Sequence, residues 1–147
     1  MMDKPASLKM AVMPGAFNIH RFAPTDTVPT DILTGGFFSI CRTDEELSIV
    51  CADTIPLASA RCDAGWSCIK VLGPLGFSMI GILAHLAGLL AQAGISIFAL
   101  STYDTDYILV KTGQLAPAVT ALKAGGGIRF CNTGLDFGDM SLGRALP

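Results

Sequence analysis

Residues 71–103 contain no aspartate, glutamate, lysine or arginine, and this limits the available folds more than any other feature of the sequence. A membrane-spanning helix needs about 20 unbroken apolar residues. This stretch is interrupted by glycine and proline at 73–76 and by Gln-Ala-Gly at 92–94. A buried helix followed by a β-hairpin is therefore the stronger interpretation, and a membrane span is the weaker one.

The helix is predicted over residues 78–93, because apolar side chains recur there at i, i+3 and i+4. Ser78 suits the N-cap, and Gly94 suits the left-handed position after the last turn. After Gly94 the sequence becomes rich in β-branched and aromatic residues, which predicts strands over 95–102 and 107–111. A polar turn at 103–106 joins these two strands.

The composition predicts a folded chain with a large apolar content. Of its 147 residues, 51% are hydrophobic and 15% are charged, against a typical charged fraction of about 25%. This length allows one domain of ordinary size or two small ones. The apolar excess predicts that a second copy covers part of the surface, which would make the protein a homodimer.

Several classes of partner are disfavoured. The net charge is −2 and no basic run is present, which argues against nucleic acid as a partner. Residues 1–9 lack an apolar h-region, so we expect no secretory signal and a cytoplasmic location. No group of His, Cys and acidic residues has metal-ligand spacing, and no phosphate-binding glycine motif occurs, so we expect neither a metal nor a cofactor.

The cysteines are expected to be reduced thiols. Their number is odd, and no two have the C-x-x-C spacing. Several lie in apolar runs that are typical of buried strands. The five are Cys41, Cys51, Cys62, Cys68 and Cys131.

The remaining elements follow from periodicity and from breaker residues. We predict strands at 8–12, 16–22, 37–42, 47–52, 66–72 and 128–131, one helical turn at 30–33 and a helix at 114–124. Residues 53–65 are predicted to be a connection. The second half is therefore β-α-β-β-α-β, an α+β ferredoxin-like unit with two helices on one face of an antiparallel sheet.

An internal repeat extends this prediction to the first half. Residues 42–50 align with residues 101–110 if one residue is inserted, and both segments predict a strand, an acidic turn with threonine and a second strand. We therefore expect two ferredoxin-like modules in tandem. Residues 1–62 form a degenerate first module, residues 63–131 form the second, and residues 132–147 form a C-terminal tail.

Three stretches carry a resemblance to a known family: FFSICRTDEELSIVC at 37–51, residues 65–111 with the run ISIFALSTYDTDYILVK, and LAPAVTALKAGG at 115–126. The chain resembles small bacterial proteins with tandem ACT (βαββαβ) domains, which are related to the eukaryotic cytosolic arginine sensors. The resemblance implies a regulatory module that binds an amino acid or a similar small molecule at an interface between paired domains. It does not imply which ligand.

Two segments are predicted to contact that ligand. The loop before the helix combines glycine, which allows close backbone approach, with a helix N-terminus, whose free N–H groups favour a carboxylate. A tight turn without a ligand is the alternative from the residues alone, and the resemblance favours the ligand. The loop residues are Gly73, Pro74, Leu75, Phe77 and Ser78.

The hairpin turn is the second segment, because it holds more hydrogen-bonding groups than a bare turn needs. Asp104 or Asp106 suits an ammonium or guanidinium group, and Ser101 or Thr102 suits a carboxylate. A structural role is the alternative, since Asp and Thr are ordinary turn formers. The turn residues are Ser101, Thr102, Tyr103, Asp104, Thr105 and Asp106.

These observations predict a non-enzymatic regulatory or sensor protein that binds an amino acid or similar metabolite and acts on a separate protein. Two alternatives stay open. One is a small enzyme that uses Asp104 or Asp106 as a base on a bound metabolite. The other is a purely structural interaction module whose turns hold no ligand.

Overall fold

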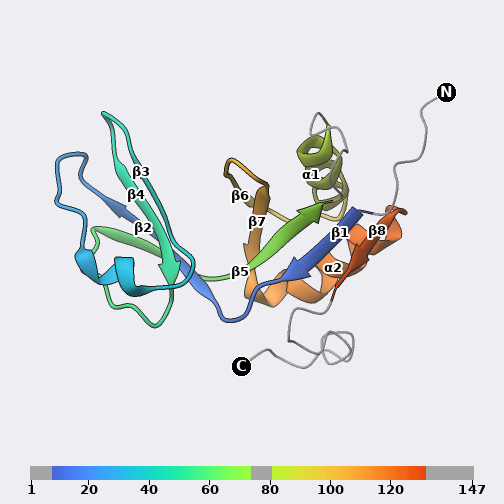
Figure 1. Ribbon diagram of the computed structural model, residues 1–147, viewed down its shortest axis with the longest axis horizontal. Helices are drawn as coiled ribbons and strands as arrows, with labels where there is room; N and C mark the ends of the chain where they lie inside the picture. The colour runs from blue at the N-terminus through green and yellow to red at the C-terminus, as the bar shows by residue number, and fades with distance from the viewer. Residues whose placement is uncertain (1–7, 74–80, 132–147) are drawn as a thin grey trace. The chain divides into compact units, whose positions relative to one another are not determined.

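The computed structural model describes residues 8–73 and 81–131 (Figure 1). The chain forms two compact units. Unit 2 is the continuous segment Gly15–Trp66, and unit 1 combines Met1–Pro14 with Ser67–Pro147. Unit 2 is thus inserted in the sequence of unit 1, whereas the sequence predicted one module after the other, with a boundary between residues 62 and 63.

Unit 2 contains a four-stranded antiparallel sheet in the order β3-β4-β2-β5. Its first strand lies between its third and its last, which is the ferredoxin-like order. A single 3₁₀ turn replaces the first helix, so this is the degenerate module that the sequence predicted. The elements are β2 (Phe17–Phe22), η1 (Thr30–Thr34), β3 (Ser39–Arg42), β4 (Leu47–Ala52) and the first half of β5 (Arg61–Gly73).

Alternation along β4 builds the core of unit 2. Leu47, Ile49 and Cys51 point to one face of the sheet and are completely buried. Ile32 from η1 and Phe22 from β2 pack against them. The short 3₁₀ turn therefore contributes one anchoring side chain where a full helix would contribute a stripe.

Within its described residues, unit 1 contains five strands in the order β6-β7-β5-β1-β8 and two helices. The first strand of the βαββαβ unit, β5, lies beside the third, β7, which is the order of a ferredoxin-like sheet. Its elements are β1 (Leu8–Val12), the second half of β5, α1 (Ile82–Gln92), β6 (Phe98–Ser101), β7 (Asp106–Lys111), η2 (Thr112–Gln114), α2 (Leu115–Ala124) and β8 (Ile128–Phe130).

Strand β1 occupies a place in unit 1 that the sequence did not predict. It pairs antiparallel with β5 and parallel with β8, so it separates the first and last strands of the ferredoxin-like unit. Leu8, Met10 and Val12 are buried in the core of unit 1. Their burial explains why this strand belongs to unit 1 rather than to the module in which the sequence boundary placed it.

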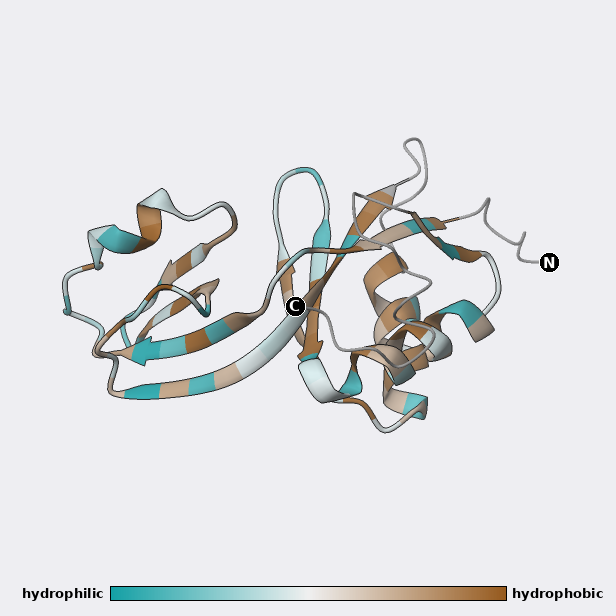
Figure 2. Cartoon of the chain, turned by 90° about the horizontal axis from the view of Figure 1, so that it is seen from below, coloured by the Kyte–Doolittle hydropathy of each residue, from teal (hydrophilic) through white to brown (hydrophobic). Residues whose placement is uncertain are grey.

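Both helices pack on the same face of the unit 1 sheet, as Figure 2 shows. Ile82, Leu86 and Leu90 of α1 follow the predicted helical stripe and are buried. Leu115, Ala118, Val119 and Leu122 are the buried residues of α2. Among the described residues, no helix has the length and apolarity needed to cross a membrane.

Three elements begin three or more residues away from the predicted position. Helix α1 begins at Ile82, because Gly81 before it has φ +89°, outside the helical region. The predicted N-cap Ser78 lies outside the described residues. Strand β6 begins at Phe98 rather than at residue 95. Strand β5 begins at Arg61, so residues 61–65 form a strand and not a connection. Gly94, with φ +75°, takes the left-handed position that the sequence predicted.

We expect Leu86→Ala to lower the free energy of unfolding by about 2–5 kcal/mol, because Leu86 is fully buried between α1 and the sheet and its truncation leaves a cavity. Leu33→Ala is the matched control, since Leu33 is 58% exposed, and a change within about 0.5 kcal/mol is expected. Chemical denaturation measures both. Equal losses for the two variants would contradict this core.

The burial of His20 on β2 predicts a pH-dependent stability for unit 2. The imidazole is buried, its Nδ1 lies 2.8 Å from the hydroxyl of Ser59, and its Nε2 has no hydrogen-bond partner among the described residues. Burial lowers the pKa of this histidine below its ordinary value. The unfolded chain therefore takes up a proton at a higher pH than the folded chain does.

It follows that the free energy of unfolding falls as the pH drops below about 6.5, the ordinary imidazole pKa. We expect His20→Gln to remove up to about 1.4 kcal/mol per pH unit of this slope. His85→Gln serves as the control, because its imidazole is exposed on α1. Denaturation between pH 5 and 7 measures the slopes, and a wild-type slope in His20→Gln would refute the assignment.

Candidate functional site

The β6–β7 hairpin ends in a short, tightly hydrogen-bonded turn. Ser101 and Asp106 face each other as the last register pair of the two strands. The amide of Thr102 donates to the carbonyl of Thr105 at 2.8 Å, and the amide of Thr105 donates to the Thr102 hydroxyl at 3.3 Å. The turn is therefore held by its own threonine, which leaves the Ser101–Asp106 pair at its base in a defined place.

Asp106 is a buried carboxylate at this base. It is 8% exposed, and its Oδ1 accepts a hydrogen bond of 2.6 Å from the Ser101 hydroxyl. Among residues 8–73 and 81–131, no lysine or arginine forms an ion pair with it. A buried carboxylate with one neutral partner is costly. A cation that reached this carboxylate would compensate the cost of its burial.

Thr105 connects the turn to β5. Its hydroxyl donates to the carbonyl of Val71 at 2.6 Å, two residues before Gly73 at the end of that strand. The structure thus brings the turn and the end of β5 together. The predicted loop residues Pro74, Leu75, Phe77 and Ser78 lie outside the described residues.

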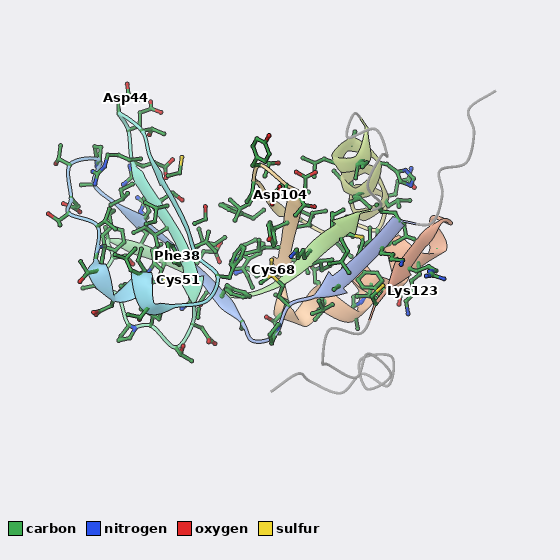
Figure 3. All side chains as sticks on the ribbon, viewed as in Figure 1. Phe38, Asp44, Cys51, Cys68, Asp104 and Lys123 are labelled. Carbon is green, nitrogen blue, oxygen red and sulfur yellow. The ribbon has the colours of Figure 1, made fainter. Side chains whose placement is uncertain are left out.

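The tip of the turn differs from its base. At the tip, Tyr103 is fully exposed, and Thr102 and Asp104 are exposed as well. At the base, Ser101 is exposed and its partner Asp106 is buried. Figure 3 shows Asp104 at the end of this hairpin and Asp44 at the end of the β3–β4 hairpin of unit 2. Of the two predicted carboxylates, Asp106 is held by the fold and Asp104 is in water.

The β3–β4 hairpin of unit 2 repeats this turn. Thr43 donates its amide to the carbonyl of Glu46 at 2.8 Å, and the Glu46 amide donates to the Thr43 hydroxyl at 3.1 Å. Strands β4 and β7 also share the same order of buried and half-buried residues. Thr43 therefore matches Thr102 with no inserted residue, and the one-residue insertion predicted from the sequence is wrong.

The gapless match isolates two substitutions at the base of the turn. Asp106 stands where unit 2 has Leu47, which is completely buried, and Ser101 stands where unit 2 has Arg42. A leucine at this position is what folding alone favours. The carboxylate and its serine partner are therefore the features that distinguish the base of the unit 1 turn from that of unit 2.

Sequence reasoning named Asp106 but missed its burial and missed Val71. A gapless repeat alignment would have revealed the burial, because it places Asp106 opposite an apolar position. The Val71 contact uses a backbone carbonyl, which every residue type has, so the sequence could not indicate it.

Neither of the two buried cysteines, Cys51 and Cys68, has the pKa that a nucleophilic thiol needs. Burial raises the pKa of Cys68 to about 12. Burial, with a smaller effect from Cys62, raises the pKa of Cys51, whereas a reactive cysteine needs a lowered pKa. All five cysteines are free thiols in the structure. The described residues contain no group of three or more His, Cys, Asp or Glu able to hold a metal ion.

Two family models match the chain, one for each unit. A model described as an ACT domain matches residues 61–124, and a model described as an N-terminal domain matches residues 15–57. A crystal structure of a protein from Agrobacterium tumefaciens is 34% identical, with a TM-score of 0.79 over 90% of this chain and 99% of that one. The crystal structure of aspartokinase alpha and beta subunits, at 18% identity, shares the fold, with a TM-score of 0.61 over 82% of this chain and 98% of that one.

Curated relatives match shorter parts of the sequence. The Homo sapiens protein named cytosolic arginine sensor for mTORC1 subunit 1 is 37% identical over 59 residues, which are 40% of this chain and 18% of that protein. The Mus musculus protein of the same name is 29% identical over 112 residues, which are 66% of this chain and 34% of that protein. The chain thus spans about a third or less of the length of these relatives.

Proposed function

We propose that this chain, whose residues 61–124 match the ACT-domain model, is a regulatory protein that binds a free amino acid with a cationic side chain at the β6–β7 hairpin. The observation that carries the proposal is the buried carboxylate of Asp106, which takes the place of a core leucine in the repeated hairpin. A guanidinium or ammonium group is the natural partner of such a carboxylate, and the charge-assisted bond compensates its burial.

The other predicted residues have complementary roles in this proposal. Ser101 orients Asp106, and Thr105 holds the turn against β5. Because the Ser101 hydroxyl donates to Asp106, we assign the ligand's carboxylate to the backbone N–H groups that the sequence places near Phe77 and Ser78. Gly73, Pro74 and Leu75 complete the loop, and Thr102, Tyr103 and Asp104 border the ligand from the tip of the turn.

In this proposal the protein is a sensor and not an enzyme, acts in the cytoplasm and controls a separate protein. Thermal-shift screening with the twenty amino acids tests this role. L-arginine and L-lysine should give the largest stabilisation, about 2.7 kcal/mol at a concentration of 100 Kd, and neither should be consumed during incubation. Turnover of the stabilising amino acid would favour the enzymatic alternative, and stabilisation by none of the twenty would favour the structural one.

Asp106→Asn should weaken the binding of L-arginine about ten- to a hundredfold, because it removes the charge from one hydrogen bond and keeps the shape of the side chain. Isothermal titration calorimetry measures the loss. Asp104→Asn should cost less, since water competes for that exposed carboxylate. Asp44→Asn, which neutralises an exposed carboxylate at the tip of the unit 2 hairpin, is the control and should bind as the wild type does. An unchanged affinity in Asp106→Asn would place the site elsewhere.

We also propose that the protein is a homodimer. The support is the apolar content of 51%, together with exposed apolar side chains such as Ile40 on β3. Light scattering at micromolar concentration should give twice the mass of the 15.3 kDa chain. A strict monomer at that concentration would contradict the proposal.

A further inference from the structure

We propose that Arg42 acts as a built-in ligand that closes the hairpin of unit 2, so that the hairpin of unit 1 is the only one of the two that accepts a small molecule. The closure rests on contacts within unit 2. The statement about unit 1 rests on the proposed function.

The guanidinium of Arg42 bridges the hairpin and the turn that follows β2. Its Nη1 donates to the carbonyl of Pro24, and its Nη2 donates to the carbonyl of Asp26 at 2.8 Å. The turn itself is closed by two further bonds: the Asp26 amide donates to the Ala23 carbonyl, and the Ala23 amide donates to the Asp26 carboxylate, each at 3.0 Å. One side chain thus holds two neighbouring carbonyls of a loop against the start of the hairpin turn.

Arginine is suited to this contact because its planar guanidinium carries several donors in a rigid fork. Serine, which unit 1 has at the matching position, is too short to make it. Ser101 uses its hydroxyl for Asp106 instead. At this one position of the hairpin, the Arg42 side chain of unit 2 therefore donates to loop carbonyls, and the Ser101 side chain of unit 1 donates to a carboxylate.

The second difference acts in the same direction. Leu47 leaves unit 2 without a carboxylate at the base of its turn. The base of the unit 2 turn thus carries a cation of its own, Arg42, and has no buried carboxylate to attract another, since the acidic residues Asp44 and Glu45 lie exposed at the tip. The two substitutions together predict one amino acid bound per chain, although the turn occurs twice.

Hydrogen exchange on the free protein tests the closure. In Arg42→Ser the amides of Ala23 and Asp26 should exchange about three- to tenfold faster, because the carbonyls that anchor their turn lose their donors. Arg42→Lys keeps the charge without the fork and should exchange at an intermediate rate. Arg61→Ser, which removes another exposed arginine of unit 2, should exchange as the wild type does. Unchanged rates in Arg42→Ser, with Ile49 still protected in the core, would overturn the closure.

Calorimetric titration with L-arginine tests the number of sites. One equivalent per wild-type chain is expected, and Asp106→Asn should weaken that equivalent. Two equivalents per wild-type chain would overturn the inference, because unit 2 would then be open. An absence of any arginine binding would contradict the proposed function and the unit 1 statement, while the exchange rates would still decide the closure by Arg42.

Discussion

A single strand of thirteen residues, β5, supplies backbone hydrogen bonds to both units. Residues 61–66 pair with β2 in unit 2, and residues 69–73 pair with β1 in unit 1. A bulge interrupts the strand where Gly65, with φ +83°, donates its amide to the side chain of Asn18 at 3.2 Å. The end of this strand receives the Thr105 hydroxyl, so the candidate site depends on where β5 ends.

The two hairpins separate what folding requires from what it does not. Both turns are closed by a threonine in the same position, and both second strands bury the same positions. These shared features build the fold. The base of the turn is where they diverge: unit 2 has leucine and an arginine that binds its own loop, and unit 1 has a buried aspartate held by serine. The buried Asp106, present in one copy of the turn and replaced by leucine in the other, is therefore the basis of the proposed ligand site.

Local sequence patterns predicted most elements. The elements that they missed are those whose place depends on strand pairing between residues far apart in the sequence. The stripe of α1, Gly94 and both hairpins could be read from the sequence because each depends on neighbours within a few residues. The place of β1 could not, since its apolar residues fit either core and only its pairing with β5 and β8 decides. Residues 61–65 were predicted to be a connection because they are polar or small, although they form a strand through backbone pairing with β2. The burial of Asp106 was not predicted, because the residue inserted in the repeat alignment kept Asp106 from being aligned with the buried Leu47.

If Asp106 receives the cationic group of the ligand, the carboxyl-carbon NMR resonance of this residue must respond to binding. On saturation with L-arginine, we expect the Asp106 resonance to shift together with the amides of Thr105 and Val71, while the Asp44 resonance in unit 2 stays unchanged. Arginine binding that leaves the Asp106 resonance where it is in the free protein would contradict the proposed role of Asp106.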